Sequence, residues 1–354
     1  MVHMKDNRGR EIDYLRISVT DRCNLRCRYC MPEEGCECFT HQEMMTLEEL
    51  ALVSACMAGL GVRRIRLTGG EPLVRKNLVW LIGEIHKIPG IEEITMTSNG
   101  ILLADMAAGL KAAGLSGVNV SLDTLDRQRF LDITRRDEFG QVMKGIQAAR
   151  TAGLQVKINC AVLEPLPLAD LRAFAEFSVQ QQIPVRFIEM MPIGEGCSFS
   201  TTDNDQILKR LTELYADVTV LTQKIGNGPA VYYGFADGRG RIGFISAVHH
   251  RFCDSCNRVR ITSDGYLKLC LAGGEGISLR DAMRGGMETE ALTGLIRQTI
   301  LQKPEGHHFA QNLPPSAGEG DSPYFPPNAG EGDSPLAEQK QGKKNTVNMN
   351  RIGG

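Results

Sequence analysis

Two groups of three cysteines are the residues of this sequence whose type and spacing best suit metal binding. The first group lies in "TDRCNLRCRYCMP" (20–32) and the second in "FCDSCNRVRITSDGYLKLC" (252–270), and together they comprise Cys23, Cys27, Cys30, Cys253, Cys256 and Cys270. Structural zinc sites and iron–sulfur clusters usually take four protein ligands. Each group therefore leaves one ligand position open to a small molecule.

Five further cysteines lie outside the two groups: Cys36, Cys38, Cys56, Cys160 and Cys197. The last three are isolated, and we interpret them as ordinary core or surface thiols. Cys36 and Cys38 follow the first group closely enough to supply a fourth ligand. His249 or His250 could likewise complete a zinc site with the second group. These alternatives are open at this point.

Charge and composition exclude several classes of protein. The 354 residues include 40 basic and 42 acidic side chains, for a net charge of −2, which argues against nucleic-acid binding and membrane-surface binding. The N-terminal residues lack the apolar core of a signal peptide, and no apolar run reaches the roughly 18 residues of a membrane span. Eleven cysteines in such a protein indicate metal binding rather than a disulfide framework, and we expect a cytoplasmic location.

Strand-like and helix-like segments alternate through the first half of the chain. We expect strands at 15–20, 64–69, 93–99, 117–123, 156–163 and 185–191, and helices at 46–60, 75–88, 102–113, 139–152 and 168–181. Further on, 203–214 is helix-like, and 218–224 and 241–248 are strand-like. Six consecutive βα units predict a parallel sheet, either doubly wound or curved into a barrel.

The alternation of side chains within these strands favours the barrel. In the first strand Ile17 and Val19 share one face, while Arg16, Ser18 and Thr20 share the other, and the next four strands repeat the pattern. A sheet covered by helices on both sides would be apolar on both faces. We therefore predict an incomplete TIM-type βα barrel with six parallel strands and a polar interior. An open sheet with one solvated face is the alternative.

The predicted interior is cationic. Arg16, Arg66 and Lys157 point inward on this interpretation, and Asp123 is the only evident acid on the same faces. Because buried cations need partners, we expect an anionic ligand such as a polyphosphate or a carboxylate.

The domain organisation follows from these patterns. We expect the partial barrel at 1–200, a smaller region with the second cysteine group at 201–309, and a tail at 310–354. The tail contains a duplication, "PPSAGEGDSPYF" (314–325) followed by "PPNAGEGDSPLA" (326–337), whose composition is typical of a disordered insertion, and it ends in Gly353 and Gly354.

The first cysteine group resembles the signature of the radical S-adenosylmethionine superfamily. The spacing C-x3-C-x2-C with an aromatic residue before the last cysteine carries the resemblance, and "LTGGEP" (67–72) adds to it. The resemblance implies a [4Fe–4S] cluster whose free iron binds S-adenosylmethionine and cleaves it to a 5′-deoxyadenosyl radical. It also implies a set of cofactor-binding residues, namely Tyr29, Gly69, Gly70, Glu71, Ser121 and Met191.

The second cysteine group narrows the resemblance to the GTP 3′,8-cyclase family. "LRISVTDRCNLRCRYCMP", "IRLTGGEPLVR", "FCDSCNRVRITSDG" and the terminal "MNRIGG" all resemble that family. The resemblance implies a second [4Fe–4S] cluster whose open iron binds the guanine of GTP. It implies cyclisation of GTP to (8S)-3′,8-cyclo-7,8-dihydroguanosine 5′-triphosphate, a lyase reaction that begins molybdenum cofactor biosynthesis.

The same resemblance implies roles for individual cations and for partners. Substrate-binding residues would be Arg16, Arg66, Thr97, Lys157, Arg258 and Arg260. Catalytic candidates are Arg186, Arg258 and Arg260, and an ion pair with Glu189 is the alternative role of Arg186. The expected partners are an electron donor of the flavodoxin or ferredoxin type and the next enzyme, cyclic pyranopterin monophosphate synthase. We expect a monomer or a homodimer.

Two other functions compete with this one. A radical S-adenosylmethionine enzyme that modifies a peptide could also carry an auxiliary cluster, but such enzymes usually complete that cluster with a fourth cysteine. A non-enzymatic zinc scaffold would explain the cysteines alone, without the "GGEP" motif or the polar interior.

Overall fold

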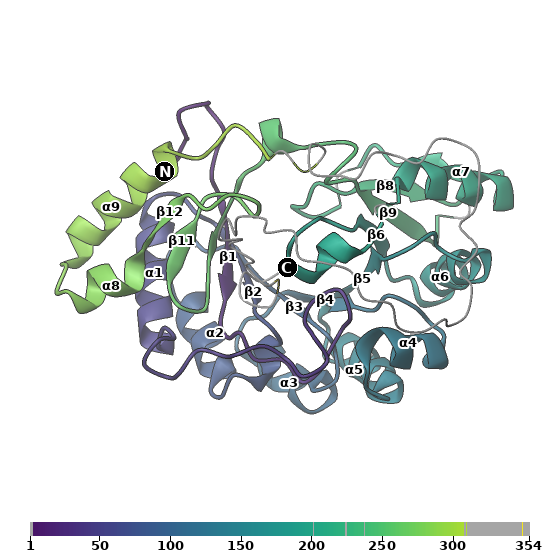
Figure 1. The fold of residues 1–354 in the computed structure, drawn as a ribbon, viewed down its shortest axis with the longest axis horizontal. Helices are drawn as coiled ribbons and strands as arrows, with labels where there is room; N and C mark the ends of the chain where they lie inside the picture. Colours follow the sequence, from purple (N-terminus) through teal and green to yellow (C-terminus); the bar gives the residue numbers. More distant parts are fainter. Residues whose placement is uncertain are drawn as a thin grey trace, which may run out of the picture.

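Six parallel strands form the centre of the structure, a computed structural model that describes residues 3–307 except 201, 224 and 237, together with 309 and 349. They are β1 (Tyr14–Ser18), β2 (Arg64–Thr68), β3 (Glu93–Ser98), β4 (Gly117–Ser121), β5 (Gln155–Val162) and β6 (Val185–Glu189). They pair in parallel, as the sequence predicts, and the structure shows that they follow one another in chain order. In Figure 1 they follow an arc, with helices along its outer side.

The five helices predicted in this half of the chain are present: α1 (Leu47–Gly59), α2 (Leu78–His86), α3 (Leu103–Ala112), α5 (Phe139–Thr151) and α6 (Leu168–Gln181). The structure adds α4 (Arg127–Thr134), which the sequence analysis missed because few apolar residues mark its buried face. Asp126 caps this helix, since its Oδ1 accepts a hydrogen bond from the Arg129 backbone N at 2.7 Å.

The sheet continues beyond the six strands on both sides. β10 (Arg258–Ile261) pairs in parallel with β1, and the antiparallel strands β11 (Tyr266–Lys268) and β12 (Gly276–Ser278) follow it. At the other end β9 (Arg241–Ile245) pairs in parallel with β6, followed by antiparallel β8 (Val231–Gly234) and β7 (Thr219–Val220). The parallel part is therefore wider than the predicted six strands, because segments from the second half of the chain extend it.

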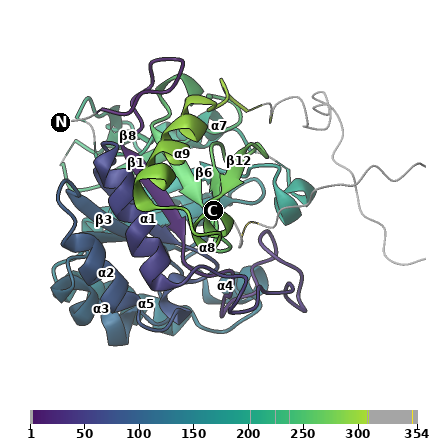
Figure 2. The ribbon, with the colours of Figure 1, turned by 90° about the vertical axis from the view of Figure 1, so that its left-hand side faces the viewer.

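The remaining helices are α7 (Asn204–Leu214), α8 (Leu279–Arg284) and α9 (Thr289–Leu301), of which only the first was predicted. Figures 1 and 2 both place α9 beside α1, so the chain after residue 301 returns to the side of the sheet where β1 and β10 lie. Within the described residues, none of the helices combines the length and the apolar character needed to cross a membrane.

The two faces of the central strands differ as predicted. On the helix side Ile65, Leu67 and Met96 are fully buried in the apolar core. The polar side is not left to bulk solvent either, since Asn119 is 4% exposed and Arg186 is 4% exposed. At these positions the polar face is therefore enclosed rather than solvated.

Candidate active site

The polar face of the sheet lines one large cavity, with an empty volume of about 2080 Å³ that includes part open to solvent. Its wall contains all six cysteines of the two groups: Cys23, Cys27, Cys30, Cys253, Cys256 and Cys270. All of them are free thiols, and the two groups, far apart in the sequence, face one space.

The first cysteine group lies on the loop after β1 and is held by the end of α4. The Arg26 and Arg28 backbone N atoms donate to the carbonyl O atoms of Thr134 (3.1 Å) and Ile133 (3.0 Å). From the residue after α4, Arg135 Nη1 donates to the carbonyls of Arg26 and Met31, at either end of the cysteine turn. The helix that the sequence analysis missed therefore positions the first metal-binding loop.

These half-buried thiols lie in a setting that favours a metal. Burial raises the pKa of the Cys23 thiol to about 11 and raises that of Cys27 well above its ordinary value. Metals bind the thiolate, which an apolar setting disfavours unless a cation compensates. The donor set therefore fits an iron–sulfur cluster, whose irons would supply that positive charge.

The glycines of "LTGGEP" let two loops approach closely. The Gly70 backbone N donates to the Thr20 carbonyl at 2.8 Å, and the Glu71 backbone N donates to the Arg22 carbonyl at 2.8 Å. A Cβ on Gly70 would overlap the backbone of Arg22, so a side chain there would push the cysteine loop away. The "LTGGEP" loop and the first cysteine loop are thus packed directly against each other and joined by backbone hydrogen bonds.

Glu71 lies beneath this loop, fully buried, and is not itself part of the cavity wall. Its carboxylate accepts hydrogen bonds from Leu73 N (3.0 Å), Ser98 Oγ (2.8 Å) and Asn99 N (2.7 Å). Burial raises the pKa of Glu71 to about 7, although these three donors act in the opposite direction. The carboxyl group is thus held in place, and a nearby cation would stabilise its ionised form.

Tyr29 and Asp123 form a hydrogen-bonded pair in the cavity wall. The Tyr29 hydroxyl donates to Asp123 Oδ2 at 3.0 Å, and the Ala161 backbone N donates to Oδ1 at 2.8 Å. Burial raises the pKa of Asp123 to about 6. The acid that the sequence analysis placed on the inner face therefore fixes the aromatic side chain of the first cysteine loop.

The second cysteine group is brought to the cavity by β10. Asn257 Nδ2 donates to Asp13 Oδ1 at 2.6 Å, and the Tyr14 backbone N donates to the Asn257 carbonyl at 3.3 Å, which joins the start of β10 to the start of β1. Burial raises the pKa of the Cys256 thiol, but Lys303 and Arg258 outweigh it, and the net shift is downward. A thiolate is favoured here, as a metal ligand requires.

The two histidines considered as zinc ligands have other partners. His249 Nδ1 lies 3.0 Å from Glu189 Oε1, and His250 Nε2 lies 2.9 Å from Asp205 Oδ2. Neither histidine is part of the described cavity wall that holds the second cysteine group. The described contacts therefore do not support a zinc site completed by His249 or His250.

A row of arginines crosses the floor of the cavity. Arg260, Arg16 and Arg66 are register partners on the adjacent strands β10, β1 and β2. Burial lowers the pKa of Arg16, and Arg260 and Arg66 lower it further through repulsion. Burial, followed by repulsion from Arg258, lowers the pKa of Arg260 to about 10. Like charges gathered in a buried row favour an anionic ligand.

Arg186 extends this positive region from β6. Its Nε and Nη2 are buried and make no hydrogen bond within the described part of the chain. Burial lowers its pKa. Glu189, the alternative partner predicted for it, accepts instead from the Val248 backbone N (2.7 Å) and the His249 backbone N (3.1 Å). Nε and Nη2 of Arg186 are thus available to a ligand.

The structure brings together nearly all the residues predicted from sequence. Beside the cysteines, the described wall includes Arg16, Tyr29, Arg66, Gly69, Gly70, Thr97, Ser121, Arg186, Met191, Arg258 and Arg260. Lys157 lies outside that wall, with its ammonium beside Gly226, and burial lowers its pKa to about 8. In the tail, Met349 lines the cavity, whereas Gly353, Gly354 and the duplicated insert lie outside the described residues.

Several wall residues were missed by the sequence analysis. Tyr14 is buried, and its ring lies under the Arg66 guanidinium, 5.6 Å from Arg66 Cζ to the ring centroid. It precedes Arg16 by two positions, so strand alternation would have placed it inward had the predicted strand begun one residue earlier. Arg10 and Lys303 carried no such signal, because nothing in their local sequence points to the cavity.

Comparison with known proteins identifies two family matches along the chain. The model described as "Radical SAM superfamily" matches residues 17–178, and that described as "Molybdenum Cofactor Synthesis C" matches residues 183–309. Among solved structures, Streptococcus suis SuiB has a TM-score of 0.58 at 14% identity, covering 86% of this chain and 75% of that one. Native anSMEcpe with bound AdoMet has a TM-score of 0.53 at 16% identity, covering 81% of this chain and 84% of that one. At such identities the likeness shows the fold.

Curated relatives are much closer in sequence. GTP 3′,8-cyclase from Clostridium perfringens (strain 13 / Type A) is 45% identical over 309 residues, or 86% of this chain and 95% of that protein. The GTP 3′,8-cyclases of Pelotomaculum thermopropionicum (43% identical over 312 residues) and Heliobacterium modesticaldum (42% over 324 residues) cover 87% and 90% of this chain, and 96% and 98% of their own lengths.

Proposed function

The chain belongs to the GTP 3′,8-cyclase family of the radical S-adenosylmethionine superfamily, and we propose that its cavity cyclises GTP to (8S)-3′,8-cyclo-7,8-dihydroguanosine 5′-triphosphate. This lyase reaction is the first step of molybdenum cofactor biosynthesis. One observation carries the proposal: both cysteine groups and the arginine row line a single cavity. A nucleoside triphosphate needs both a cationic floor and a contact for its base.

The residues present fit two [4Fe–4S] clusters, one on each cysteine group. When bound, the first cluster and S-adenosylmethionine supply a 5′-deoxyadenosyl radical that removes the ribose 3′ hydrogen of GTP. Glu71 and the Gly69–Gly70 backbone would hold the amino acid part of the cofactor. Ser121, Met191 and Tyr29 would line the rest of its site, and the protein supplies position and exclusion of water.

GTP would lie between the two groups. Arg16, Arg66 and Arg260 would bind the triphosphate, because a guanidinium makes forked hydrogen bonds to phosphate oxygens. Thr97 has a buried Oγ1 that makes no hydrogen bond within the described residues, and it would serve the same ligand. Arg186 and Arg258 are the catalytic candidates together with Arg260, and Arg186 is also a candidate phosphate ligand because two of its nitrogens are buried without a partner among the described residues. Lys157 would reach the triphosphate only if its ammonium turned away from Gly226.

The finer architecture and the cellular setting belong to the same proposal. We take the arc of β1 to β6 as the partial barrel, with domains at 1–200 and 201–309 and a tail at 310–354. The family matches that end at 178 and begin at 183 support a boundary in this part of the chain. A cytoplasmic monomer or homodimer would receive electrons from a flavodoxin- or ferredoxin-type donor. Its product would pass to cyclic pyranopterin monophosphate synthase.

The direct test is the nucleotide dependence of cofactor cleavage. The full chain is reconstituted anaerobically with iron and sulfide, and 5′-deoxyadenosine is measured with S-adenosylmethionine, a reductant and either GTP, ATP or no nucleotide. We expect a burst with GTP alone, together with a cyclised nucleotide of the mass of GTP. Slow cleavage of S-adenosylmethionine that does not depend on GTP would contradict the assignment of GTP as the substrate. It would favour the peptide-modifying alternative, for which the arginine row offers no explanation.

The affinity for S-adenosylmethionine should depend on pH through Glu71. A carboxyl with a pKa of about 7 is roughly one-tenth ionised at about pH 6 and about nine-tenths ionised at about pH 8. Only the ionised form attracts the amino group of the cofactor, so affinity should rise about tenfold across this interval and level off above it. Equilibrium binding of the cofactor under anaerobic conditions measures the change.

The Glu71→Gln variant separates this carboxyl from other titrating groups. It should bind more weakly at high pH and lose most of the pH dependence, whereas Glu92→Gln, at an exposed position, should behave like the unmodified chain. If the affinity of the Glu71→Gln variant changed with pH as much as that of the unmodified chain, the pH dependence would be assigned to the cofactor itself.

A further inference from the structure

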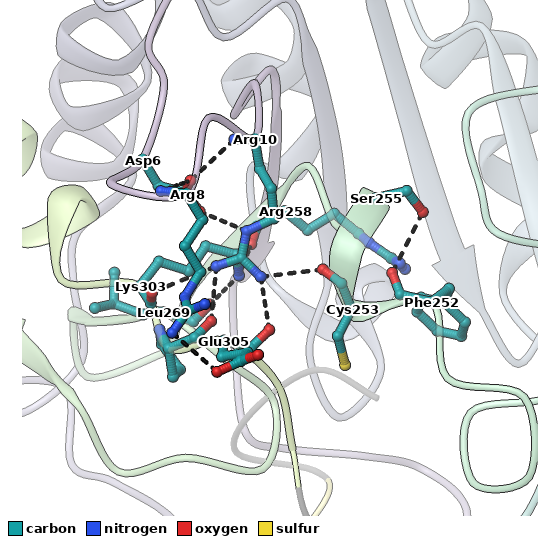
Figure 3. A network of polar contacts seen from close by, with 11 residues as sticks. Asp6, Arg8, Arg10, Phe252, Cys253, Ser255, Arg258, Leu269, Lys303 and Glu305 are labelled. Carbon is teal, nitrogen blue, oxygen red and sulfur yellow. Dashed lines mark hydrogen bonds and ion pairs between the residues drawn. The ribbon is translucent and has the colours of Figure 1, made fainter.

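Arg10 lies just before β1, more than 240 residues from the second cysteine group in the sequence, yet it is hydrogen bonded to that group. Its Nη1 donates to the carbonyls of Cys253 (3.0 Å) and Glu305 (2.9 Å), as Figure 3 shows. Its Nη2 donates to the carbonyls of Pro304 (2.7 Å) and Lys303 (3.3 Å). Since its Nε is also bonded, every N–H of this guanidinium has a partner.

The guanidinium is itself held rigidly. Arg10 Nε forms an ion pair with Asp6 Oδ2 at 2.6 Å, and both side chains are almost completely buried. Asp6 Oδ1 in turn accepts from the backbone N atoms of Arg8 (2.9 Å) and Arg10 (3.0 Å). A buried ion pair with this many hydrogen bonds has one arrangement, and losing either partner leaves a buried charge.

Lys303 holds the other two cysteines of the group. Its Nζ donates to the carbonyl of Arg258 at 2.8 Å and to that of Leu269. Arg258 follows Cys256 by two residues, and Leu269 directly precedes Cys270. One ammonium therefore joins the start of β10, next to Cys256, to the residue before Cys270.

The charge of Lys303 is also placed toward the same cysteines. The residue is 6% exposed and lines the cavity. Burial lowers the pKa of Lys303, Cys256 and Cys270 act in the opposite direction, and Arg10 and Arg258 lower it further. Next to it the chain passes over the third cysteine, since a Cβ on Gly306 would lie 3.1 Å from Cys253 Sγ.

We propose that Arg10 and Lys303 are a pair of positioning residues for the second iron–sulfur cluster. Arg10 fixes the backbone at Cys253 to the segment after α9. Lys303 fixes the backbone next to Cys256 and Cys270 and places a buried positive charge near these two cysteines. This proposal rests on the proposed function in one respect, that the second cysteine group holds a cluster.

The two cations should have separable effects on that cluster. Lys303→Met replaces the side chain by an unbranched one that is one atom shorter and removes its charge, so we expect a lower midpoint potential, because a nearby positive charge favours the reduced cluster. Lys303→Arg keeps the charge and should have a midpoint potential close to that of the unmodified chain. Arg10→Lys keeps the charge but loses the forked hydrogen bonds to the backbone carbonyls. We expect a chelator to remove iron from the second cluster about 10- to 100-fold faster, because losing a residue that supports the ligands of a metal site usually costs that much.

The test uses the full chain, reconstituted anaerobically, with iron content, electron paramagnetic resonance during a reductive titration, and chelator release as readouts. The electron paramagnetic resonance spectrum and the iron content of the first cluster serve as the internal reference. Matched controls are Arg8→Lys, which affects only an exposed ion pair with the Glu305 carboxylate, and Lys111→Met on the surface of α3. Both should match the unmodified chain.

Two results would overturn the proposal. One is a Lys303→Met or Arg10→Lys protein whose second cluster has an unchanged potential and release rate. The other is equal loss of both clusters with a lower unfolding temperature, which would indicate a general structural role. If the unmodified chain binds only the first cluster, then the proposed function fails at that step, and the positioning role falls with it.

Discussion

Cys27→Ala is expected to abolish formation of 5′-deoxyadenosine, with or without GTP. Cys27 is half-buried at the centre of the first cysteine loop, and alanine leaves no ligand in its place. Losing an outer partner of a metal site usually costs about 10- to 100-fold, so the loss of a ligand should exceed 100-fold. We expect the iron content to fall by about half, because the second cysteine group is on other elements.

Anaerobic reconstitution followed by product and iron analysis checks this expectation. Cys197→Ala is the matched control, since that thiol is exposed and lies outside both groups. Substantial cofactor cleavage by the Cys27→Ala protein would mean that another thiol, such as Cys36 or Cys38, completes the site. Loss of all iron would mean that the two sites assemble together.

Arg186→Gln is expected to weaken GTP binding without weakening the fold. Truncating one partner of a buried charged contact costs about 2–5 kcal/mol, which corresponds to roughly 30- to several-thousand-fold in affinity. The effect should appear as a higher KM for GTP. Arg186→Lys should recover part of the loss, since lysine keeps the charge but not the forked geometry.

The same substitution should leave thermal stability unchanged or higher. Two nitrogens of Arg186 are buried without hydrogen-bond partners among the described residues, and such a charge is unfavourable in the empty protein. Arg150→Gln, which loses only an exposed contact to Gln181, is the control. A lower unfolding temperature with an unchanged KM would contradict the phosphate-binding role and assign Arg186 to the core.

The positions of the first six strands could be predicted from sequence because they depend on local features. Alternation of side chains places Arg16 and Arg66 on one face and Ile65 on the other, whatever the rest of the chain does. The cysteine loop and "LTGGEP" follow strands directly, and parallel strands end at a common edge, so their meeting was predictable. The short helix α4 escaped because its few apolar residues mark it weakly.

Placement of the second half of the chain was decided by tertiary structure. β10 pairs with β1, and β9 with β6, although their local sequences do not specify a neighbour. Lys157 has the right parity for the cavity, but its ammonium lies beside Gly226 because a loop from the second half reaches it.

What the sequence determined by itself is the chemistry of the two cysteine groups, since ligand type and short spacing are local properties that survive any fold. What only the tertiary structure decided is that both groups share one cavity, with Arg10 and Lys303 bonded around the second. Contacts between residues more than 240 positions apart depend on strand order and on the return of α9 beside α1. No local pattern encodes them, because the free energy of such pairings comes from burial of the whole sheet and its helices.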